Sequence, residues 1–176
     1  MSDVTIRAAT PADIPAITAI YAFEVREKTA SFELTPPDEA EMMRRFITLI
    51  NNGFPYLVAE AGGHVAGYAY AGPYRPRPAY RYTVENTVYL DPAYYRRGIG
   101  SALLTELIAQ CTARGFRQMI AVIGDSANAA SICLHRRAGF AMIGTHPNVG
   151  LKFGRWFDSV QMQLALGEGR TTTPQE

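Results

Sequence analysis

One stretch of the sequence has a composition that suits the binding of a diphosphate. A predicted helix beginning near Ala102 is preceded directly by Arg96-Arg97-Gly98-Ile99-Gly100-Ser101. Glycines let the backbone turn sharply and approach a ligand, and a helix N-terminus presents free N–H groups to an anion. The two arginines add positive charge beside those groups. Residues 96–101 are therefore predicted to form a diphosphate cradle.

Other glycine-rich motifs fit this stretch less well. A dinucleotide-binding fingerprint needs a third glycine where Leu103 stands, and it belongs in the first strand–helix unit of a chain. A Walker loop needs Gly-Lys-Ser/Thr, which does not follow here. A plain glycine turn before a helix is the remaining alternative, and the adjoining arginines favour the anion site.

A carboxylate also stands in an unusual place. Glu85 lies within Tyr82–Leu90, the longest predicted strand, which is otherwise apolar and aromatic. Burial would raise its pKa toward that of a useful general base. The alternative is an exposed glutamate on the solvent face of a half-buried strand.

Polar side chains recur along a later predicted helix over residues 128–138. Asn128, Ser131 and His135 are spaced by three and four residues, so they share one helix face. A histidine can donate or relay a proton near neutral pH. The alternative for His135 is a capping or solvent-facing histidine beside Arg136 and Arg137.

A proline-rich loop over residues 72–81 carries arginines and tyrosines just before Glu85. Arg75 and Arg77 can bind a carboxylate or a phosphinate with paired N–H donors, and Pro76 stiffens the loop between them. This arrangement suits a small amino acid whose α-amine points at Glu85. A rigid solvated loop, a subunit contact or a polyproline ligand at Pro73-x-x-Pro76 are the alternatives.

Composition narrows the class of protein. The chain has 176 residues and a net charge of +1, and this length predicts one domain with little long-range attraction for nucleic acid or an anionic membrane. No apolar stretch reaches the roughly 18 residues of a membrane helix, and no signal peptide is indicated. Cys111, Cys133 and the three histidines lack metal-ligand spacing. We expect a cytoplasmic protein with no metal, nucleic-acid or membrane partner.

The predicted elements indicate an α/β fold with a mixed sheet. Helices are expected after the threonine N-caps of Thr10-Pro11 and Thr35-Pro36. Next come a hairpin over 56–70, a strand over 82–90, a helix ending at Gly115, a strand over 119–123, the helix 128–138 and strands over 141–145 and 158–166. This order is typical of a central, mostly antiparallel sheet with flanking helices rather than a doubly wound one. Residues 1–166 are assigned to a single domain and 167–176 to a flexible C-terminal tail.

Taken together, these motifs resemble the GCN5-related N-acetyltransferase (GNAT) superfamily. Its acetyl-CoA loop, Q/R-x-x-G-x-G/A, is matched by residues 95–100 except that Tyr95 stands at the Gln/Arg position, and Asn128–Phe140 is similar to its second cofactor segment. The sequence is most similar to the phosphinothricin and methionine sulfoximine acetyltransferases. The matching segments, spread across most of the chain, are Tyr70-Ala71-Gly72-Pro73, Thr83–Tyr89, Asn128–Phe140 and Val149–Trp156.

The resemblance implies a GNAT fold, acetyl-CoA as co-substrate and specific roles for residues. It implies Glu85 as general base, and His135 at a position where many members have a tyrosine that protonates the departing thiolate. It places Asn128, with Ser131 on the same face, on the cofactor. A splayed strand at Val88, Tyr89 and Leu90 is expected to bind the pantetheine arm through its backbone and to polarise the thioester.

For the acceptor, the resemblance implies contacts from Phe32, as an apolar wall over the ligand, and from Asn86 and Thr87 beside Glu85. Lys152-Phe153-Gly154-Arg155-Trp156 implies a homodimer whose partner borders the substrate site, and an ordinary β-hairpin is the alternative.

The leading hypothesis is an acetyl-CoA-dependent N-acetyltransferase that acts on the α-amine of a small glutamate-like amino acid, such as phosphinothricin or methionine sulfoximine. One alternative is acetylation of another small amine, an ordinary amino acid or a polyamine. The arginine-rich loop argues against a polyamine. A non-catalytic acyl-CoA-binding module is the third hypothesis, and it would keep the cradle but tolerate loss of Glu85.

Overall fold

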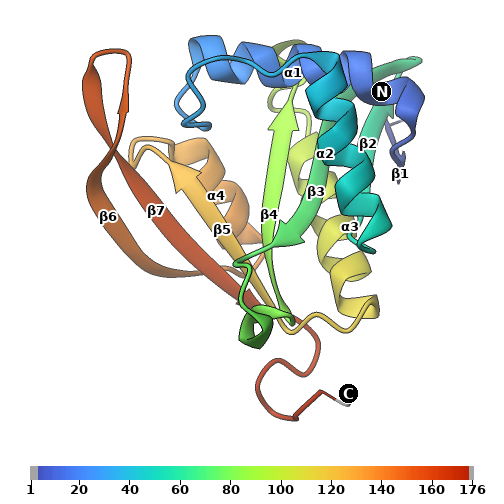
Figure 1. Ribbon diagram of the computed structural model, residues 1–176, viewed down its shortest axis with the longest axis vertical. Helices are drawn as coiled ribbons and strands as arrows, with labels where there is room; N and C mark the ends of the chain where they lie inside the picture. Colours follow the sequence, from blue (N-terminus) through green and yellow to red (C-terminus); the bar gives the residue numbers. More distant parts are fainter. Residues whose placement is uncertain (1–3, 175–176) are drawn as a thin grey trace.

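The computed structural model describes residues 4–174, which form one seven-stranded sheet with helices on both faces (Figure 1). In chain order the elements are β1 (Val4–Ala8), the 3-10 turn η1 (Pro11–Asp13), α1 (Ile14–Glu27), α2 (Glu39–Asn51), β2 (Tyr56–Ala61), β3 (His64–Pro73), η2 (Pro78–Tyr80), β4 (Thr83–Leu90), η3 (Pro92–Tyr94), α3 (Ile99–Ala113), β5 (Gln118–Gly124), α4 (Ala129–Arg137), β6 (Ala141–Lys152) and β7 (Arg155–Ala165).

The sheet is mixed and mostly antiparallel. Its strand order is β1-β2-β3-β4-β5-β7-β6, and only β4 and β5 run parallel. A parallel pair needs a crossover, and α3 supplies it. The predicted α/β class, with a mostly antiparallel central sheet and flanking helices, is confirmed.

The N-terminal helix begins where its capping residues predict. The Asp13 carboxylate accepts a hydrogen bond from the Thr10 backbone N–H at 2.7 Å and is paired with Arg7 at 2.8 Å. The Asp13–Thr10 contact is one half of a capping box, which closes the first turn before α1.

The second helix begins later than predicted, because its N-cap is Asp38 and not Thr35. The Asp38 carboxylate accepts from the Glu41 N–H at 2.8 Å. A start at Thr35 would place Pro36 in the helix immediately before Pro37, and the residue before a proline is disfavoured in the α conformation.

Each face of the sheet has its own hydrophobic core. Helix α3 buries Leu103, Leu104 and Leu107 against one face, where α4 also packs. Helices α1 and α2 cover the other face, with Ile17 and Phe46 buried against strand tyrosines. Side chains at alternate positions of a strand therefore point toward different helix pairs.

The outer strands differ most from the sequence-based expectation. Strand β1 was not predicted, and it pairs along its whole length with β2. The last two strands are longer than the predicted 141–145 and 158–166, and they form a hairpin whose turn holds Phe153 and Gly154 at positive φ. After β7 the chain forms turns over 167–170, where Glu168 is paired with Arg117 at 3.1 Å. Among the helices of residues 4–174, none has the length and hydropathy of a membrane span.

Candidate active site

The central feature of the site is a gap in the sheet between β4 and β5. Their parallel pairing runs from Thr83–Gln118 to Asn86–Ala121 and then stops, although β4 continues to Leu90 and β5 to Gly124. The strands diverge beyond this point, so the backbone groups that face the gap do not bond across it. The splayed strand that the family resemblance implied is therefore present.

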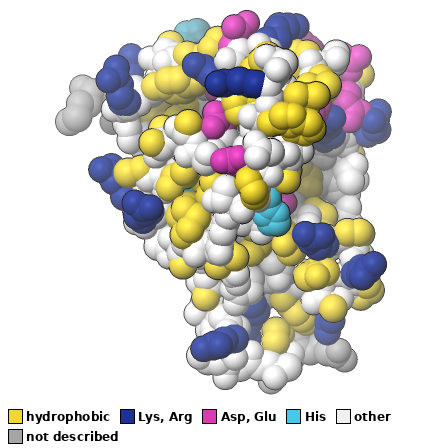
Figure 2. Space-filling view, turned by 90° about the vertical axis from the view of Figure 1, so that its left-hand side faces the viewer, with side chains coloured by type: hydrophobic (Ala, Val, Ile, Leu, Met, Phe, Trp, Pro, Cys, Tyr) yellow, Lys and Arg dark blue, Asp and Glu magenta, His cyan; other side chains and the backbone are white. Residues whose placement is uncertain are grey.

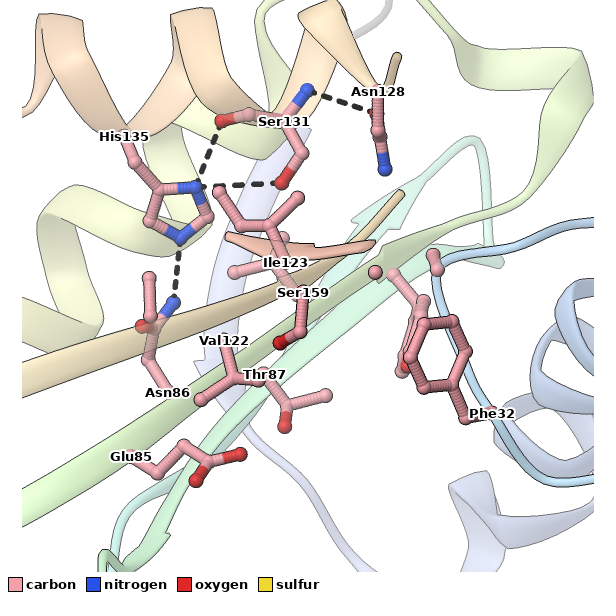
Figure 3. A pocket seen from close by; sticks show the side chains of 15 residues that line it. Phe32, Glu85, Asn86, Thr87, Val122, Ile123, Asn128, Ser131, His135 and Ser159 are labelled. Atoms are coloured by element: carbon pink, nitrogen blue, oxygen red, sulfur yellow. Dashed lines mark hydrogen bonds between the residues drawn. The ribbon is translucent and has the colours of Figure 1, made fainter. Parts of the chain in front are cut away.

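A pocket of about 220 Å³ occupies this gap (Figure 3). It is lined by Ala30, Phe32, Glu85, Asn86, Thr87, Val88, Tyr89, Ala121, Val122, Ile123, Gly124, Asn128, Ser131, His135 and Ser159.

The pocket reaches both faces of the sheet. On β4, Glu85 and Thr87 lie on the α1/α2 face, whereas Asn86 lies on the face covered by α3 and α4. Figure 3 shows Glu85, Thr87 and Phe32 on one side of the strands and His135, Ser131 and Asn128 along α4 on the other. Two ligands can therefore meet in the gap, one from each face.

Glu85 has the surroundings expected of a base. Its side chain is half-buried, and burial raises the pKa of the carboxyl above its ordinary value, while the positive charge of Arg75 opposes that rise. An amine in the pocket would meet this carboxylate on the α1/α2 face.

His135 is buried, 4% exposed, so the solvent-facing alternative is wrong. Its Nδ1 lies 2.8 Å from the Ser131 carbonyl oxygen, which can only accept, so Nδ1 carries a proton. Burial lowers the pKa of the ring, and Nε2 of the neutral ring accepts from the Asn86 amide at 2.9 Å. The ring proton thus points at Ser131, and the buried Asn86 Oδ1 is left without a hydrogen-bond partner.

The predicted cradle forms the start of α3. Gly98 is the N-cap in the left-handed conformation, φ 80°, and the Ala102 N–H is bonded to the Gly98 carbonyl. By helix geometry the N–H groups of Ile99, Gly100 and Ser101 precede the first intrahelical bond and stay free for an anion. The exposed Arg96 and Arg97 adjoin them.

Two residues of this region have roles in packing. A Cβ at Gly100 would meet Leu90 and Leu134 at 3.5 Å, an ordinary van der Waals distance, so α3 packs on both leucines at this position. The hydroxyl of Tyr95 donates to the Glu24 carboxylate of α1 at 3.0 Å. Tyr95, which stands where the family motif has Gln or Arg, therefore connects this loop to α1 on the other face of the sheet.

The predicted acceptor loop lies outside the pocket wall. Arg75, Pro76 and Arg77 are exposed and are not among the lining residues. Arg75 stacks over the Tyr74 ring at 5.0 Å, and it is near enough to act on the pKa of Glu85.

The sequence analysis missed the pocket residues of β5 and the loop residue Ala30. Val122, Ile123 and Gly124 line the gap, and Ser159 of β7 adjoins them. A strand that runs parallel to the Glu85 strand contributes residues to a site at the carboxyl end of the pair. The strand predicted over 119–123 could have been identified as that partner.

Comparison with known proteins agrees with this geometry. An acetyltransferase (GNAT) domain model matches residues 6–161. The chain is 52% identical over 171 residues to a phosphinothricin N-acetyltransferase of Alcaligenes faecalis, covering 97% of this chain and 87% of that one. It is 46% identical over 168 residues to an L-methionine sulfoximine/L-methionine sulfone acetyltransferase of Pseudomonas aeruginosa, covering 95% and 97%.

A solved structure is similar throughout. The GNAT superfamily phosphinothricin acetyltransferase of Sinorhizobium meliloti, in complex with AcCoA, superimposes with a TM-score of 0.96 at 51% identity, covering 100% of this chain and 95% of that one. The chain belongs to the GNAT family of acetyl-CoA-dependent N-acetyltransferases.

Proposed function

We propose that the protein transfers the acetyl group of acetyl-CoA to the α-amine of a small glutamate-like amino acid such as phosphinothricin or methionine sulfoximine. The observation that carries this proposal is the Glu85 carboxylate in a pocket that opens to both faces of the sheet, with Arg75 close enough to act on it. Relatives named for these two acceptors support the substrate class.

Glu85 starts the reaction by taking a proton from the α-ammonium group of the acceptor, directly or through water. The free amine attacks the thioester carbonyl, which becomes a tetrahedral oxyanion. When this intermediate collapses, the C–N bond remains, the C–S bond breaks, the attacking nitrogen gives up its second proton, and the CoA thiolate leaves and takes up a proton. The raised pKa of Glu85 makes its carboxylate a stronger base than an exposed glutamate.

Backbone groups of β4 stabilise the oxyanion and hold the pantetheine arm. Val88, Tyr89 and Leu90 lie in the part of β4 that has no pairing with β5, so N–H groups on that edge are available to a ligand. A backbone N–H held rigidly near the carbonyl is an effective oxyanion donor. The diphosphate is held by Arg96, Arg97, Gly98, Ile99, Gly100 and Ser101, and Asn128 and Ser131 contact the cofactor from α4.

We assign His135 to the protonation of the departing thiolate. In the free protein the ring proton is on Nδ1 and Nε2 accepts from Asn86, so Nε2 must first take up the proton that the amine nitrogen gives up as the amide forms, and it then donates that proton to the thiolate.

The acceptor is held from the α1/α2 face. Arg75 and Arg77, with Pro76 between them, reach its acidic groups from the rim of the pocket, and Phe32 covers its apolar part. Thr87 lies two residues from Glu85 on the same face of β4, close to the reacting amine, whereas Asn86 lines the pocket from the other face, where it bonds His135.

We further propose a homodimer. Six large apolar side chains of the β6–β7 hairpin are between 47% and 59% exposed: Met142, Ile143, Val149, Leu151, Phe153 and Trp156. Figure 2 views this side of the molecule, where hydrophobic side chains are spread over the middle of the face and acidic ones lie in its upper half. A second copy that covers this surface would remove exposed apolar side chains from water.

We also propose a cytoplasmic protein with no nucleic-acid or membrane partner, in which residues 1–166 are the acetyltransferase domain. The last two residues of the predicted tail, 167–176, lie outside the described residues 4–174. The two cysteines, Cys111 and Cys133, are not joined in a disulfide, which supports the location, and the net charge of +1 supports the absence of a polyanionic partner.

The test of the function is thiol release from acetyl-CoA with a panel of amines. We expect release with phosphinothricin and methionine sulfoximine and little with polyamines. Release with polyamines or ordinary amino acids alone would overturn the substrate assignment. Tight acetyl-CoA binding with no release for any amine would instead indicate an acyl-CoA-binding module.

A further inference from the structure

The loop between α1 and α2 carries Phe32 into the pocket, and its first part, residues 28–33, is held by several contacts. The Thr29 hydroxyl donates to the Asp125 carboxylate at 3.1 Å, and the Ser31 hydroxyl is 2.9 Å from that of Tyr21. Glu33 in turn is paired with Arg45 of α2 at 2.7 Å. The loop is therefore held in one position in the free protein.

A lysine that is far away in the sequence also holds this loop. Lys152, at the end of β6, is only 3% exposed, and its ammonium donates to the carbonyl oxygens of Lys28 at 2.8 Å and Ser31 at 2.6 Å. Burial lowers the pKa of this lysine, and the nearby buried Glu24 opposes that effect. Burying a charged group is unfavourable unless hydrogen-bond partners compensate for the lost water. The partners of the Lys152 ammonium are two backbone carbonyl oxygens of this loop.

Two glycines make room for the Phe32 ring and for the loop backbone. A Cβ at Gly150 would lie 2.4 to 2.7 Å from three carbons of the Phe32 ring. A Cβ at Gly124 would lie 2.3 Å from the Thr29 carbonyl oxygen and 3.2 Å from the same ring. Gly150 and Lys152 are alternate residues of β6 and therefore face the loop from the same side of the strand. We call Gly124, Gly150 and Lys152 the Phe32 seat.

We propose that the Phe32 seat positions the wall of the acceptor pocket and so sets which amino acids the enzyme accepts. Lys152 fixes the loop backbone, and the two glycines fix how far the Phe32 ring withdraws from Glu85. This inference rests on the proposed function, because it assigns the acceptor to the α1/α2 side of the pocket. The residues act through Phe32 and are positioning residues, not catalytic ones.

The first test removes the ammonium and keeps its bulk. We expect Lys152→Met to raise the acceptor KM by roughly tenfold, because a wall displaced by about 1 Å can cost up to about a hundredfold in rate. The KM for acetyl-CoA should stay unchanged, and the preference between phosphinothricin and a bulkier amino acid should narrow. Lys28→Met removes an exposed lysine from the same loop and is the matched control, with normal kinetics expected. An equal loss for every acceptor, or no change in acceptor KM, would overturn the proposal.

A second test uses stability and does not depend on the substrate. Gly150→Ala should lower the urea midpoint when Phe32 is present and should leave it unchanged in a Phe32→Ala background, because the added methyl then has space. Equal effects in both backgrounds would show that the ring is not seated at Gly150. If this coupling is found but the wild-type protein acetylates none of the glutamate analogues, the seat stands and the proposed substrate fails.

Discussion

Replacement of Glu85 by glutamine tests the base most directly. The change exchanges one carboxylate oxygen for an NH₂ group of nearly the same size, so the packing of β4 is preserved and only the charge and basicity are lost. General-base catalysis contributes about 10² to 10⁴ in rate, equivalent to about 3–5 kcal/mol in the activation barrier. We expect Glu85→Gln to lower kcat within this range.

The same variant should leave cofactor binding intact. The carboxylate lies on the α1/α2 face, whereas the cradle and α4 lie on the other. Calorimetric titration should therefore give an acetyl-CoA Kd within about twofold of the wild type, since a twofold change is only about 0.4 kcal/mol. A near-normal kcat would place the base elsewhere, and a large loss of affinity would show that the two faces are not independent.

The pH dependence of the wild type checks the assignment. The base works only as a carboxylate, and burial raises its pKa above the ordinary 4.5, so kcat should fall as the pH drops through that raised value. Arg75 lowers the pKa, so Arg75→Gln should move the acidic limb to higher pH. Because Arg75 is exposed, high salt should move the wild-type limb in the same direction. If neither Arg75→Gln nor high salt moves the acidic limb of the pH profile, Glu85 is not the titrating group.

Three further predictions concern other parts of the molecule. Gly98→Val should weaken acetyl-CoA binding by about tenfold or more, because a β-branched residue is strained at φ 80°. Gly115→Val is the control, since it is equally strained but lies at the far end of α3. It should lower the stability of the protein and leave the calorimetric affinity for acetyl-CoA unchanged. Burial holds the pKa of His135 below its ordinary 6.5, so the unfolded state binds more protons and the unfolding free energy should fall as the pH drops from 6.5 to the lowered value. Urea titrations across this range should lose that component in His135→Gln and keep it in His64→Gln, whose histidine is exposed. Trp156→Glu should convert a dimer to a monomer in sedimentation experiments, and an unchanged mass would argue against the hairpin as the interface.

Local chemistry made much of the fold predictable. The capping residues before α1, the 61–64 turn and the glycine that ends α3 are short-range signals, and the elements they delimit form close to where they are expected. Strand β1 escaped prediction because five residues carry too little periodicity. The start of α2 was misplaced because Pro37 restricts Pro36, a constraint that outweighs the N-cap preference of Thr35.

The site was predictable in its chemistry but not in its architecture. Glu85 and the cradle stand out through residue type and spacing. The burial of Lys152 does not, because a lysine on a strand is normally exposed, and its partners lie more than 120 residues away in the chain. The gap that makes the pocket depends on where the pairing of β4 and β5 ends, and no residue pattern records that.

The gap also gives the protein a strand edge in its interior. Unpaired strand edges on a protein surface invite pairing with other chains, and proteins generally blunt or cover them. Here the unpaired parts of β4 and β5 are flanked by the α1–α2 loop on one face and by α4 on the other, so a strand of another molecule cannot align with them. The protein can therefore keep backbone groups that are not bonded between strands at its centre, without the risk of aggregation that the same groups would carry at the edge of the sheet.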